Sequence, residues 1–542
     1  MDILEGKIVD VVNRRIYSGR IYVENKRILR IDESNSTFNN YIFPGLVDAH
    51  IHIESSMLIP SRFAHIAVSH GTVASVSDPH EIANILGVQG IDFMIKDGDK
   101  VPFKFYFGAP SCVPATSFES TGSEISVPHI EDLLKKPHVK YLSEMMNFPG
   151  VINNDAQVME KISLAKKYNK PIDGHAPGLS GEDLSKYIRA GISTDHECSS
   201  LKEAEEKLQQ GMKILIREGS AAKNFDSLHS LISKCNSQVM LCSDDLHPDD
   251  LINGHINLLI RKALMKGHNI IDVLRCVSYN PIKHYNLEVG LLQEGDPADF
   301  VMVEDLNSLN VLQTWINGKI VFRNHALFQL PPIDPPNVFR NTIPPLENLR
   351  VDNLERPVNI ISVNEGQLFT SSFHHQFSTN DPYLNSDIKN DILKIVVLNR
   401  FKEGAKPSIG FIHGFGLKKG ALGSTIAHDS HNIIVVGTND EDIQICIKQL
   451  ISSKGGIIAV DKNQIDILPL AVGGIMSDKD SYYVSKSYQD LTLRARDYGC
   501  VLHAPYMTLS FMALLVIPEL KMSDRGLFDG NKFQFVDLFV NS

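Results

Sequence analysis

The sequence predicts an α/β protein built on a parallel, TIM-like (β/α)8 barrel. The chain has 542 residues, which is too long for one compact core and suits two or three domains. Between residues 44 and 285, β-rich apolar runs alternate with helical segments every ~20–35 residues, and such a barrel typically takes ~250 residues. A doubly wound sheet is the alternative, but no glycine-rich phosphate loop follows the first strands, so the barrel is favoured.

The segments on either side of the barrel predict a small β domain made from two parts of the chain. Residues 1–43 contain short apolar runs with the period of β-hairpins. After the barrel, an Asn317-Gly318 pair lies between apolar runs, which is a strong signal for a tight hairpin turn. We therefore expect residues 1–43 and 286–330 to form one composite β domain.

The rest of the chain predicts a further domain behind a linker. Residues 331–357 hold seven of the 26 prolines, which is typical of a linker. Residues 358–542 contain strand-like runs and glycine-rich turns, so we expect a C-terminal α+β domain there.

Composition and charge exclude several classes of protein. The hydrophobic fraction of 43% is that of a globular protein, and the longest apolar run, at 511–517, is far shorter than the ~18–20 residues of a membrane span. The 53 basic and 64 acidic residues give a net charge of −11 without a basic cluster, so neither nucleic acid nor a membrane is an expected partner. Seven cysteines without a C-x-x-C pair, and an N-terminus without a secretory signal, predict a cytoplasmic location.

Histidines and carboxylates recur where the predicted barrel strands end. His50 and His52 are two residues apart in PGLVDAHIH, so their side chains share one face of a strand and can bind one divalent metal. The other candidates, on predicted strands 4, 5, 6 and 8, are Glu144, His175, His196 and Asp244. Barrel enzymes build their active sites at these strand ends, so the pattern predicts a metal site there.

Each of these residues also has a simpler explanation. A single histidine at a strand end is more often structural, and Asp244 could cap the following helix, with Asp245 as a rival ligand. Five strand ends that each supply a suitable ligand nevertheless favour the metal site. Near the end of the chain, His428 and His431 could reach an active site or a metal, but a polar loop is the favoured interpretation.

With these residues the chain resembles the amidohydrolase superfamily of metal-dependent hydrolases and, within it, the adenine deaminase family. The resemblance covers most of the chain and is carried by PGLVDAHIHIESS (44–56), SDPHEIAN (77–84), EMMNFPGV (144–151), DGHAPGLSG (173–181), STDHE (193–197), CSDD (242–245), EGDPADFV (294–301) and LKMSDRG (520–526). The segments at 77–84, 144–151 and 520–526 narrow it from the superfamily to the deaminases.

The resemblance implies hydrolytic deamination of adenine to hypoxanthine and ammonia in purine salvage, by a hydroxide bound to a binuclear metal centre. It implies His50, His52 and Asp244 on one metal, His175 and His196 on the other, and Glu144 as the bridge. Many superfamily members bridge with a carboxylated lysine, and Lys140 in the same predicted strand stays an alternative. Histidine and carboxylate ligands suit Mn, Fe or Zn better than Mg or Ca, and the family favours Mn²⁺, then Fe²⁺, over Zn²⁺.

The same resemblance assigns roles in the reaction. Asp244 is predicted to take the proton of the hydroxide and pass it to the leaving amino group, and Glu144 and Asp78 complete the catalytic residues. His80 and Glu81 are predicted to bind the purine, although Asp78-Pro79 could be only a turn before a helix. The expected partner is a small purine base, and the expected assembly is a homodimer.

Three alternatives are weighed against this prediction. Zinc-dependent base deaminases carry H-x-E followed by P-C-x-x-C; His52-Ile53-Glu54 fits the first half, but the second half is missing from the sequence. A cyclic-amide hydrolase of the same superfamily would use the bridging lysine, which Glu144 opposes. A non-catalytic barrel scaffold would have lost ligands, whereas all six positions are filled.

Overall fold

The computed structural model describes residues 1–220 and 222–540, which divide into two compact units. The first unit consists of Met1–His80, Asp92–Cys112 and Ile125–Ile333, and the second consists of Glu81–Ile91, Val113–Glu124 and the chain from Asp334 on. Two short segments from the barrel region of the sequence therefore belong to the second unit.

The first unit contains an eight-stranded parallel barrel, as the sequence predicts. Its strands are β5 (Leu46–Ile51), β6 (Thr72–Ser77), β7 (Lys104–Ala109), β8 (Val139–Met145), β9 (Ile172–Gly174), β10 (Thr194–Asp195), β11 (Lys213–Arg217) and β12 (Val239–Cys242). They pair in parallel within β5–β9 and within β10–β12, and a bridge from Ile51 to Asp244 joins the end of β12 to β5. Strands β5 and β6 are buried along their whole length, which is typical of a parallel sheet covered by helices.

Helices follow the barrel strands in the order that such a barrel requires. They are α1 (Pro60–Ala67), α2 (His80–Leu86), α3 (Val88–Gly98), α4 (Val127–Leu134), α5 (Phe148–Ile152), α6 (Ala156–Lys167), α7 (Gly181–Arg189), α8 (Leu201–Gln209), α9 (Phe225–Leu228), α10 (Leu231–Lys234), α11 (Pro248–Leu251), α12 (Ile256–Met265), α13 (Ile270–Cys276) and α14 (Tyr279–Tyr285). Helix α6 shows why they form: the Asp155 side chain caps its first turn by accepting the Val158 N–H, and one face buries Val158 and Ile162.

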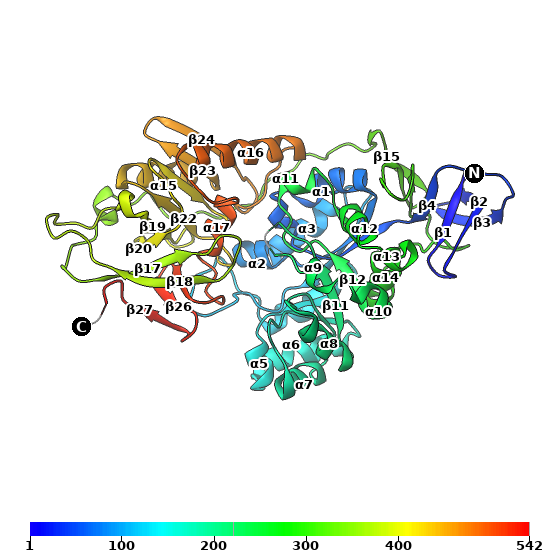
Figure 1. The fold of residues 1–542 in the computed structure, drawn as a ribbon, viewed down its shortest axis with the longest axis horizontal. Helices are drawn as coiled ribbons and strands as arrows, with labels where there is room; N and C mark the ends of the chain where they lie inside the picture. Colours follow the sequence, from blue (N-terminus) through cyan, green and yellow to red (C-terminus); the bar gives the residue numbers. More distant parts are fainter. Residues whose placement is uncertain (221, 541–542) are drawn as a thin grey trace. The chain divides into compact units, whose positions relative to one another are not determined.

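The start of the chain and the segment after the barrel share one sheet (Figure 1, blue and green strands). Its strand order is β16-β15-β14-β13-β4-β1-β2-β3. The bounds are β1 (Asp2–Asp10), β2 (Arg15–Glu24), β3 (Arg27–Glu33), β4 (Tyr41–Pro44), β13 (Phe300–Val303), β14 (Val311–Ile316), β15 (Lys319–Arg323) and β16 (His325–Ala326). Strand β4 connects the two segments within the sheet, because it pairs in parallel with β1 and antiparallel with β13. Asn317 and Gly318 form the turn between β14 and β15, with φ angles of 48° and 70°.

The second unit is built on another eight-stranded sheet, in the order β18-β17-β20-β19-β22-β21-β23-β24, and a three-stranded sheet, β25-β26-β27. The strands are β17 (Val358–Val363), β18 (Thr370–His375), β19 (Ile392–Leu398), β20 (Ser408–His413), β21 (Ala421–Ser424), β22 (Ile433–Gly437), β23 (Gly456–Asp461), β24 (Gln464–Pro469), β25 (Leu520–Ser523), β26 (Gly526–Asp529) and β27 (Gln534–Val536). Three helices accompany them: α15 (Asp440–Ser452), α16 (Ser481–Asp497) and α17 (Pro505–Phe511). Helix α15 packs Ile443, Ile447 and Leu450 into the core of this sheet.

Across the residues that the structure describes, no helix is both long and apolar enough to cross a membrane.

Candidate metal centre

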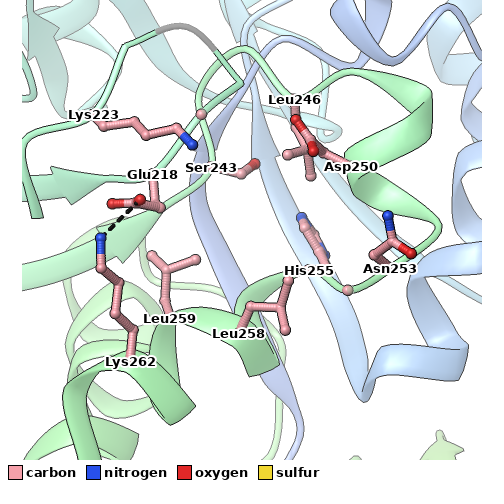
Figure 2. Close-up of a pocket in the computed structure, with 12 residues that line it drawn as sticks. Glu218, Lys223, Ser243, Leu246, Asp250, Asn253, His255, Leu258, Leu259 and Lys262 are labelled. Carbon is pink, nitrogen blue, oxygen red and sulfur yellow. Dashed lines mark hydrogen bonds and ion pairs between the residues drawn. The ribbon is translucent and has the colours of Figure 1, made fainter. Parts of the chain in front are cut away.

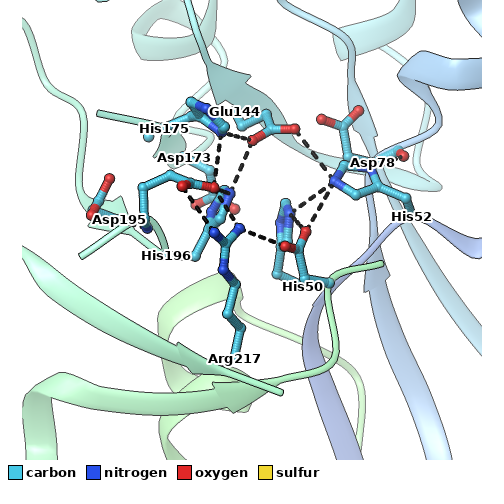
Figure 3. A network of polar contacts seen from close by, with 12 residues as sticks. His50, His52, Asp78, Glu144, Asp173, His175, Asp195, His196 and Arg217 are labelled. Carbon is cyan, nitrogen blue, oxygen red and sulfur yellow. Dashed lines mark hydrogen bonds and ion pairs between the residues drawn. The ribbon is translucent and has the colours of Figure 1, made fainter. Parts of the chain in front are cut away.

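Six predicted ligands meet at the C-terminal ends of the barrel strands, and Figure 3 labels five of them, His50, His52, Glu144, His175 and His196. His50 lies on β5, His52 directly follows it, Glu144 lies on β8, and His175, His196 and Asp244 follow β9, β10 and β12. All are buried except His175, whose side chain keeps 22% of its surface exposed. The parallel strands bring the six side chains together because their carboxyl ends share one edge of the barrel.

The carboxylate of Glu144 lies between two pairs of imidazoles. Its Oε1 is 3.4 Å from His52 Nε2 and 3.4 Å from His80 Nδ1. Its Oε2 is 2.8 Å from His175 Nδ1 and 3.1 Å from His196 Nε2. Each oxygen of one carboxylate therefore faces a different group of imidazoles, which is the arrangement that lets a carboxylate bridge two cations.

The carboxylate of Asp244 likewise lies close to two imidazoles, those of His50 and His52. Its Oδ1 is 3.4 Å from His50 Nε2 and 3.3 Å from His52 Nε2. The backbone fixes this placement, because the Asp244 N–H donates to the His50 carbonyl and the His52 N–H donates to the Asp244 carbonyl. The two imidazole Nε2 atoms are only 3.2 Å apart, so they converge on one point.

The donor set fits a pair of divalent cations. Ligand atoms of His50, His196 and Asp244 lie within 4.8 Å of one another, and those of Glu144, His175 and His196 do so as well. Imidazole nitrogens and carboxylate oxygens are ligands for first-row divalent metals. The buried His50 Nδ1 and Asp78 Oδ1 also have no hydrogen-bond partner, although most buried polar atoms in proteins have one.

His50, Glu144 and Asp244 have the charges that metal binding needs. Burial and the neighbouring His196 lower the pKa of His50, which keeps its imidazole neutral. Burial opposes ionisation of Glu144, but His175 and His196 hold the pKa of its carboxyl well below the ordinary value. The pKa of Asp244 is lowered in the same way, chiefly by Arg217 against the effect of burial. Neutral imidazole and ionised carboxylate are the forms that bind metals.

Lys140, the alternative bridge, lies apart from this cluster. Its Nζ is 3.8 Å from Glu288 Oε1, and its side chain keeps 24% of its surface exposed. Glu144 rather than Lys140 faces the imidazoles.

The structure also brings Asp78 and His80 to the cluster. His80 Nδ1 is 3.2 Å from Asp78 Oδ2, and the Asp78 carbonyl oxygen is 3.2 Å from His52 Nδ1. Asp245 accepts a hydrogen bond from Ser55 Oγ at 2.5 Å, and its carboxylate belongs to a possible ligand group with His52 and Asp244. Asp245 therefore stays a rival to Asp244 as a ligand.

Glu81 contacts two histidines of the second unit. Its Oε1 is 2.7 Å from His428 Nδ1, and its Oε2 contacts His431 Nε2. Both histidines are buried, with 7% and 1% of their surfaces exposed. The segment that was expected to be a polar loop is thus a buried one that contacts a residue at the start of α2.

Two charged residues near the ligands, Arg217 and Glu197, are not among the site residues that the sequence predicts. Arg217, at the end of β11, donates from Nη1 to Asp244 Oδ2 at 2.6 Å and from Nη2 to Glu197 Oε2 at 2.9 Å. Glu197 Oε1 is 3.4 Å from His196 Nε2. The sequence contains a signal for each of them. The apolar run at 214–216 predicts a strand that ends at Arg217, and Glu197 directly follows the predicted ligand His196.

A buried ion pair supports the loops that carry His175 and His196. Lys207 Nζ is 3.0 Å from Asp195 Oδ2 and donates to the Ala176 carbonyl at 2.7 Å. Asp195 Oδ1 accepts the Ala176 N–H at 2.9 Å. Ala176 and Asp195, which are next to the two histidines in the chain, are therefore both held by Lys207 of α8.

A cavity of about 250 Å³ opens at Ser243, the residue before Asp244 (Figure 2). Glu218 and Lys262 form an ion pair of 2.9 Å across its lining. The predicted ligands and purine-binding residues do not line this cavity, so it does not mark the site of the chemistry.

Comparisons with known proteins identify the family of the chain. Residues 41–321 match the amidohydrolase family, and residues 367–534 match the adenine deaminase C-terminal domain. Among relatives, an adenine deaminase of Sulfurovum sp. (strain NBC37-1) is 51% identical over 538 residues, covering 98% of this chain and 99% of that protein. An adenine deaminase of Methanosarcina mazei is 51% identical over 551 residues, covering 99% of each chain. One of Borreliella burgdorferi is 46% identical over 543 residues, covering 98% of this chain and 99% of that protein. By this full-length similarity, the chain belongs to the adenine deaminase family of the amidohydrolases.

Proposed function

We propose that the protein hydrolyses adenine to hypoxanthine and ammonia, as a step of purine salvage. The full-length relatives that are named adenine deaminases support the substrate. The observation that carries the chemistry is the position of Glu144, whose two oxygens face two separate groups of imidazoles at the C-terminal end of the barrel.

The proposed division of the ligands between two metals is the one that the resemblance implies. His50, His52 and Asp244 would hold one divalent cation, His175 and His196 would hold the second, and Glu144 would bridge them; the distances from Asp244 to the first two histidines and from Glu144 to the last two support this division. Two cations there would lower the pKa of water and so supply hydroxide at neutral pH. Manganese, iron and zinc all accept this mixture of nitrogen and oxygen ligands. We propose manganese first, then iron, then zinc, which is the order that the resemblance implies.

The reaction adds water at C6 of adenine and breaks the bond from C6 to the exocyclic nitrogen. One proton of the water ends on ring N1 and the other leaves with ammonia. We propose that Asp244 carries the proton to the amino group, since its carboxylate lies against the ligand pair His50 and His52. Arg217 holds the second oxygen of this carboxylate at 2.6 Å and so fixes its orientation.

Asp78, His80 and Glu81 are the proposed purine-binding and proton-transfer residues. The placement of His80 Nδ1, 3.4 Å from Glu144 Oε1, supports a position next to the reacting atoms. The unpartnered, buried Asp78 Oδ1 can accept a hydrogen bond from a purine N–H or carry the proton to N1. Glu81 directly follows His80 in the chain and supplies a second carboxylate to the same segment.

The deciding experiment measures ammonia release from adenine, adenosine, cytosine and guanine, and ring opening of dihydroorotate, by manganese-loaded and chelator-stripped protein. We expect turnover of adenine that disappears on stripping and returns with manganese. Glu144→Gln, loaded in the same way, is the matched negative control. Turnover of dihydroorotate alone would favour a cyclic-amide hydrolase, and less than about one metal per chain after loading would favour a scaffold.

Two further expectations stay predictions. These are the homodimer that the resemblance implies and the cytoplasmic location that the cysteine pattern favours. The domain boundaries proposed from the sequence, at residues 43, 285, 330 and 357, likewise stay a proposal.

A further inference from the structure

The carboxylate of Asp48 accepts hydrogen bonds from both sides of the point at which the barrel closes. Asp48 lies on β5 and is completely buried. Its Oδ1 accepts the N–H of His50 at 3.3 Å and the N–H of Ser243, the first residue after β12, at 3.1 Å. Its Oδ2 accepts the Ser243 hydroxyl and, at 2.8 Å, the Nε2–H of His255. An ionised carboxylate has lone pairs for all four donors.

The strands on the two sides of this point share little backbone pairing. A ladder of paired residues joins β11 to β12, whereas among the described residues β5 and the end of β12 share the isolated bridge from Ile51 to Asp244. The proposed ligands His50 and Asp244 lie on opposite sides, with His50 Nε2 3.4 Å from Asp244 Oδ1. Because Ser243 directly precedes Asp244, Asp48 holds the peptide groups next to both ligands.

Elements that carry no proposed metal ligand hold the ring of His255. This residue directly precedes α12, and 1% of its surface is exposed. Its Nδ1 is 2.8 Å from Thr72 Oγ1 on β6, and the ring of Phe63 on α1 meets it edge to face, with centroids 5.5 Å apart. A buried polar network in which the members are partnered in this way is rigid. The orientation of the Asp48 carboxylate is therefore set by α12, β6 and α1.

Serine, histidine and aspartate are also the residue types of a hydrolytic triad, but the contacts are different. In a triad the imidazole lies between the serine hydroxyl and the carboxylate. Here the Ser243 hydroxyl and His255 Nε2 both donate to the same oxygen of Asp48. The imidazole is thus not placed to take a proton from Ser243, and the network has the geometry of a support.

We propose that Asp48 and His255 are positioning residues, which hold the backbones of His50 and Asp244 at the separation that one divalent cation needs. His255 orients the Asp48 carboxylate, and the carboxylate fixes the two peptide groups next to the ligands. The proposal rests on the proposed function and on the proposed division of the ligands between two metals. Loss of either support should affect the metal held by His50 and Asp244 more than the other metal.

Variants of His255 that keep or remove the donor test this role. His255→Gln places an amide N–H close to the lost Nε2–H, whereas His255→Leu supplies none. We expect His255→Leu to lower kcat for adenine by about 10–100-fold while KM stays within about threefold, since Asp244 is the proposed proton carrier. His255→Gln should recover most of the loss. His284→Leu is the matched control, because it removes a histidine that contacts Lys213 at the first residue of β11, and it leaves both constants unchanged.

Calorimetric titration of each stripped variant with manganese gives a readout that does not depend on turnover. In His255→Leu and in Asp48→Asn, one manganese equivalent should bind about 10–100-fold more weakly than in wild type, and the other should stay within about threefold. Asp48→Asn acts on the carboxylate itself, because an amide nitrogen opposes the donors that the lost oxygen accepted. The thermal midpoint of each stripped variant shows whether it is folded.

The possible outcomes separate the two proposals. A wild-type protein that leaves adenine unchanged would overturn the proposed function, and the manganese titrations would still test the positioning role. Folded His255→Leu and Asp48→Asn with the manganese affinities of wild type would overturn the positioning role alone. An equal loss of both equivalents with a lowered thermal midpoint would also overturn it, since that is the result of a general loosening. If both variants fail to fold, Ser243→Ala, which loses only the hydroxyl donor, must show the selective loss, and its absence would contradict the proposal.

Discussion

Arg217 Nη1 donates to Asp244 Oδ2 across 2.6 Å, and this hydrogen bond joins the end of β11 to the proposed proton carrier after β12. The same guanidinium holds Glu197 through Nη2. Nη1 and Nη2 both donate to Glu197, and this two-point contact fixes the plane of the guanidinium from which Nη1 reaches Asp244. Arg217 therefore sets the direction in which Asp244 presents its other oxygen.

Replacement of this arginine tests that relationship. Arg217→Gln should lower kcat/KM by roughly 10- to 100-fold, because it removes a charge-assisted hydrogen bond from a buried carboxylate. Arg217→Lys keeps the charge but loses the fork, so it should fall between the glutamine variant and wild type. Steady-state kinetics of manganese-loaded protein give the answer, and equal activity of all three proteins would contradict the role.

Glu144 and Asp244 should each be indispensable. We expect Glu144→Gln and Asp244→Asn to leave less than about one hundredth of wild-type activity, since each removes an ionised ligand. Circular dichroism should show an intact fold, and elemental analysis should show reduced metal in Glu144→Gln. Activity above that level in either folded variant would contradict its assigned role.

Metal uptake should depend on pH. Burial opposes the charge on His175, but Glu197 and Glu144 raise the pKa of its imidazole to about 9 in the metal-free protein. The pKa of His52 is also raised, by Asp244 and Glu144 against burial. Both rings are then protonated at neutral pH and must lose a proton to bind a cation, so affinity rises as the pH rises towards about 9.

Calorimetric titration of stripped protein with manganese at several pH values measures this effect. In buffers of different ionisation enthalpy, the same titrations should report net release of protons. An affinity that is equal at low and high pH, with no proton release, would contradict the prediction.

The buried pair of Lys207 and Asp195 should contribute strongly to stability. Lys207→Met leaves the Asp195 carboxylate buried without its cation, which costs about 3–5 kcal/mol in comparable cases. Chemical denaturation of the stripped protein measures the change. Lys202→Met, at the start of the same helix, is the control and should stay within about 0.5 kcal/mol. A Lys207→Met variant as stable as this control would contradict the prediction.

Removal of the chain from residue 358 onward should damage the barrel region as well. Glu81–Ile91 and Val113–Glu124 belong to the second compact unit, and Ile82, Ile85 and Val113 are buried. Their apolar side chains would become exposed, so we expect aggregation and loss of activity. Size-exclusion chromatography measures the aggregation of the truncated protein, and an activity assay measures its turnover. An active, monodisperse truncation would show the expectation to be wrong.

Local sequence patterns could predict the barrel and its ligands because each ligand ends or follows a short apolar run. His50 and His52 lie on or next to a strand whose six residues are all buried, and such a strand is easily recognised. No residue of β11 was among the predicted site residues, because only Ile214, Leu215 and Ile216 separate its charged ends and nothing marked Arg217 as functional. The contacts of Glu81 could not be predicted, because its partners lie 347 and 350 positions away and no periodicity reports such a distance.

The place of β4 between β1 and β13 has a consequence for synthesis on the ribosome. Strand β13 emerges about 250 residues after β4, which at usual elongation rates means about 10–50 s. During that interval the nascent chain carries a finished hairpin of β1 and β2 next to a strand whose outer edge has no neighbour. Such an edge can pair with other chains, so we expect the amino-terminal strands of the newborn protein to benefit from protection by a chaperone.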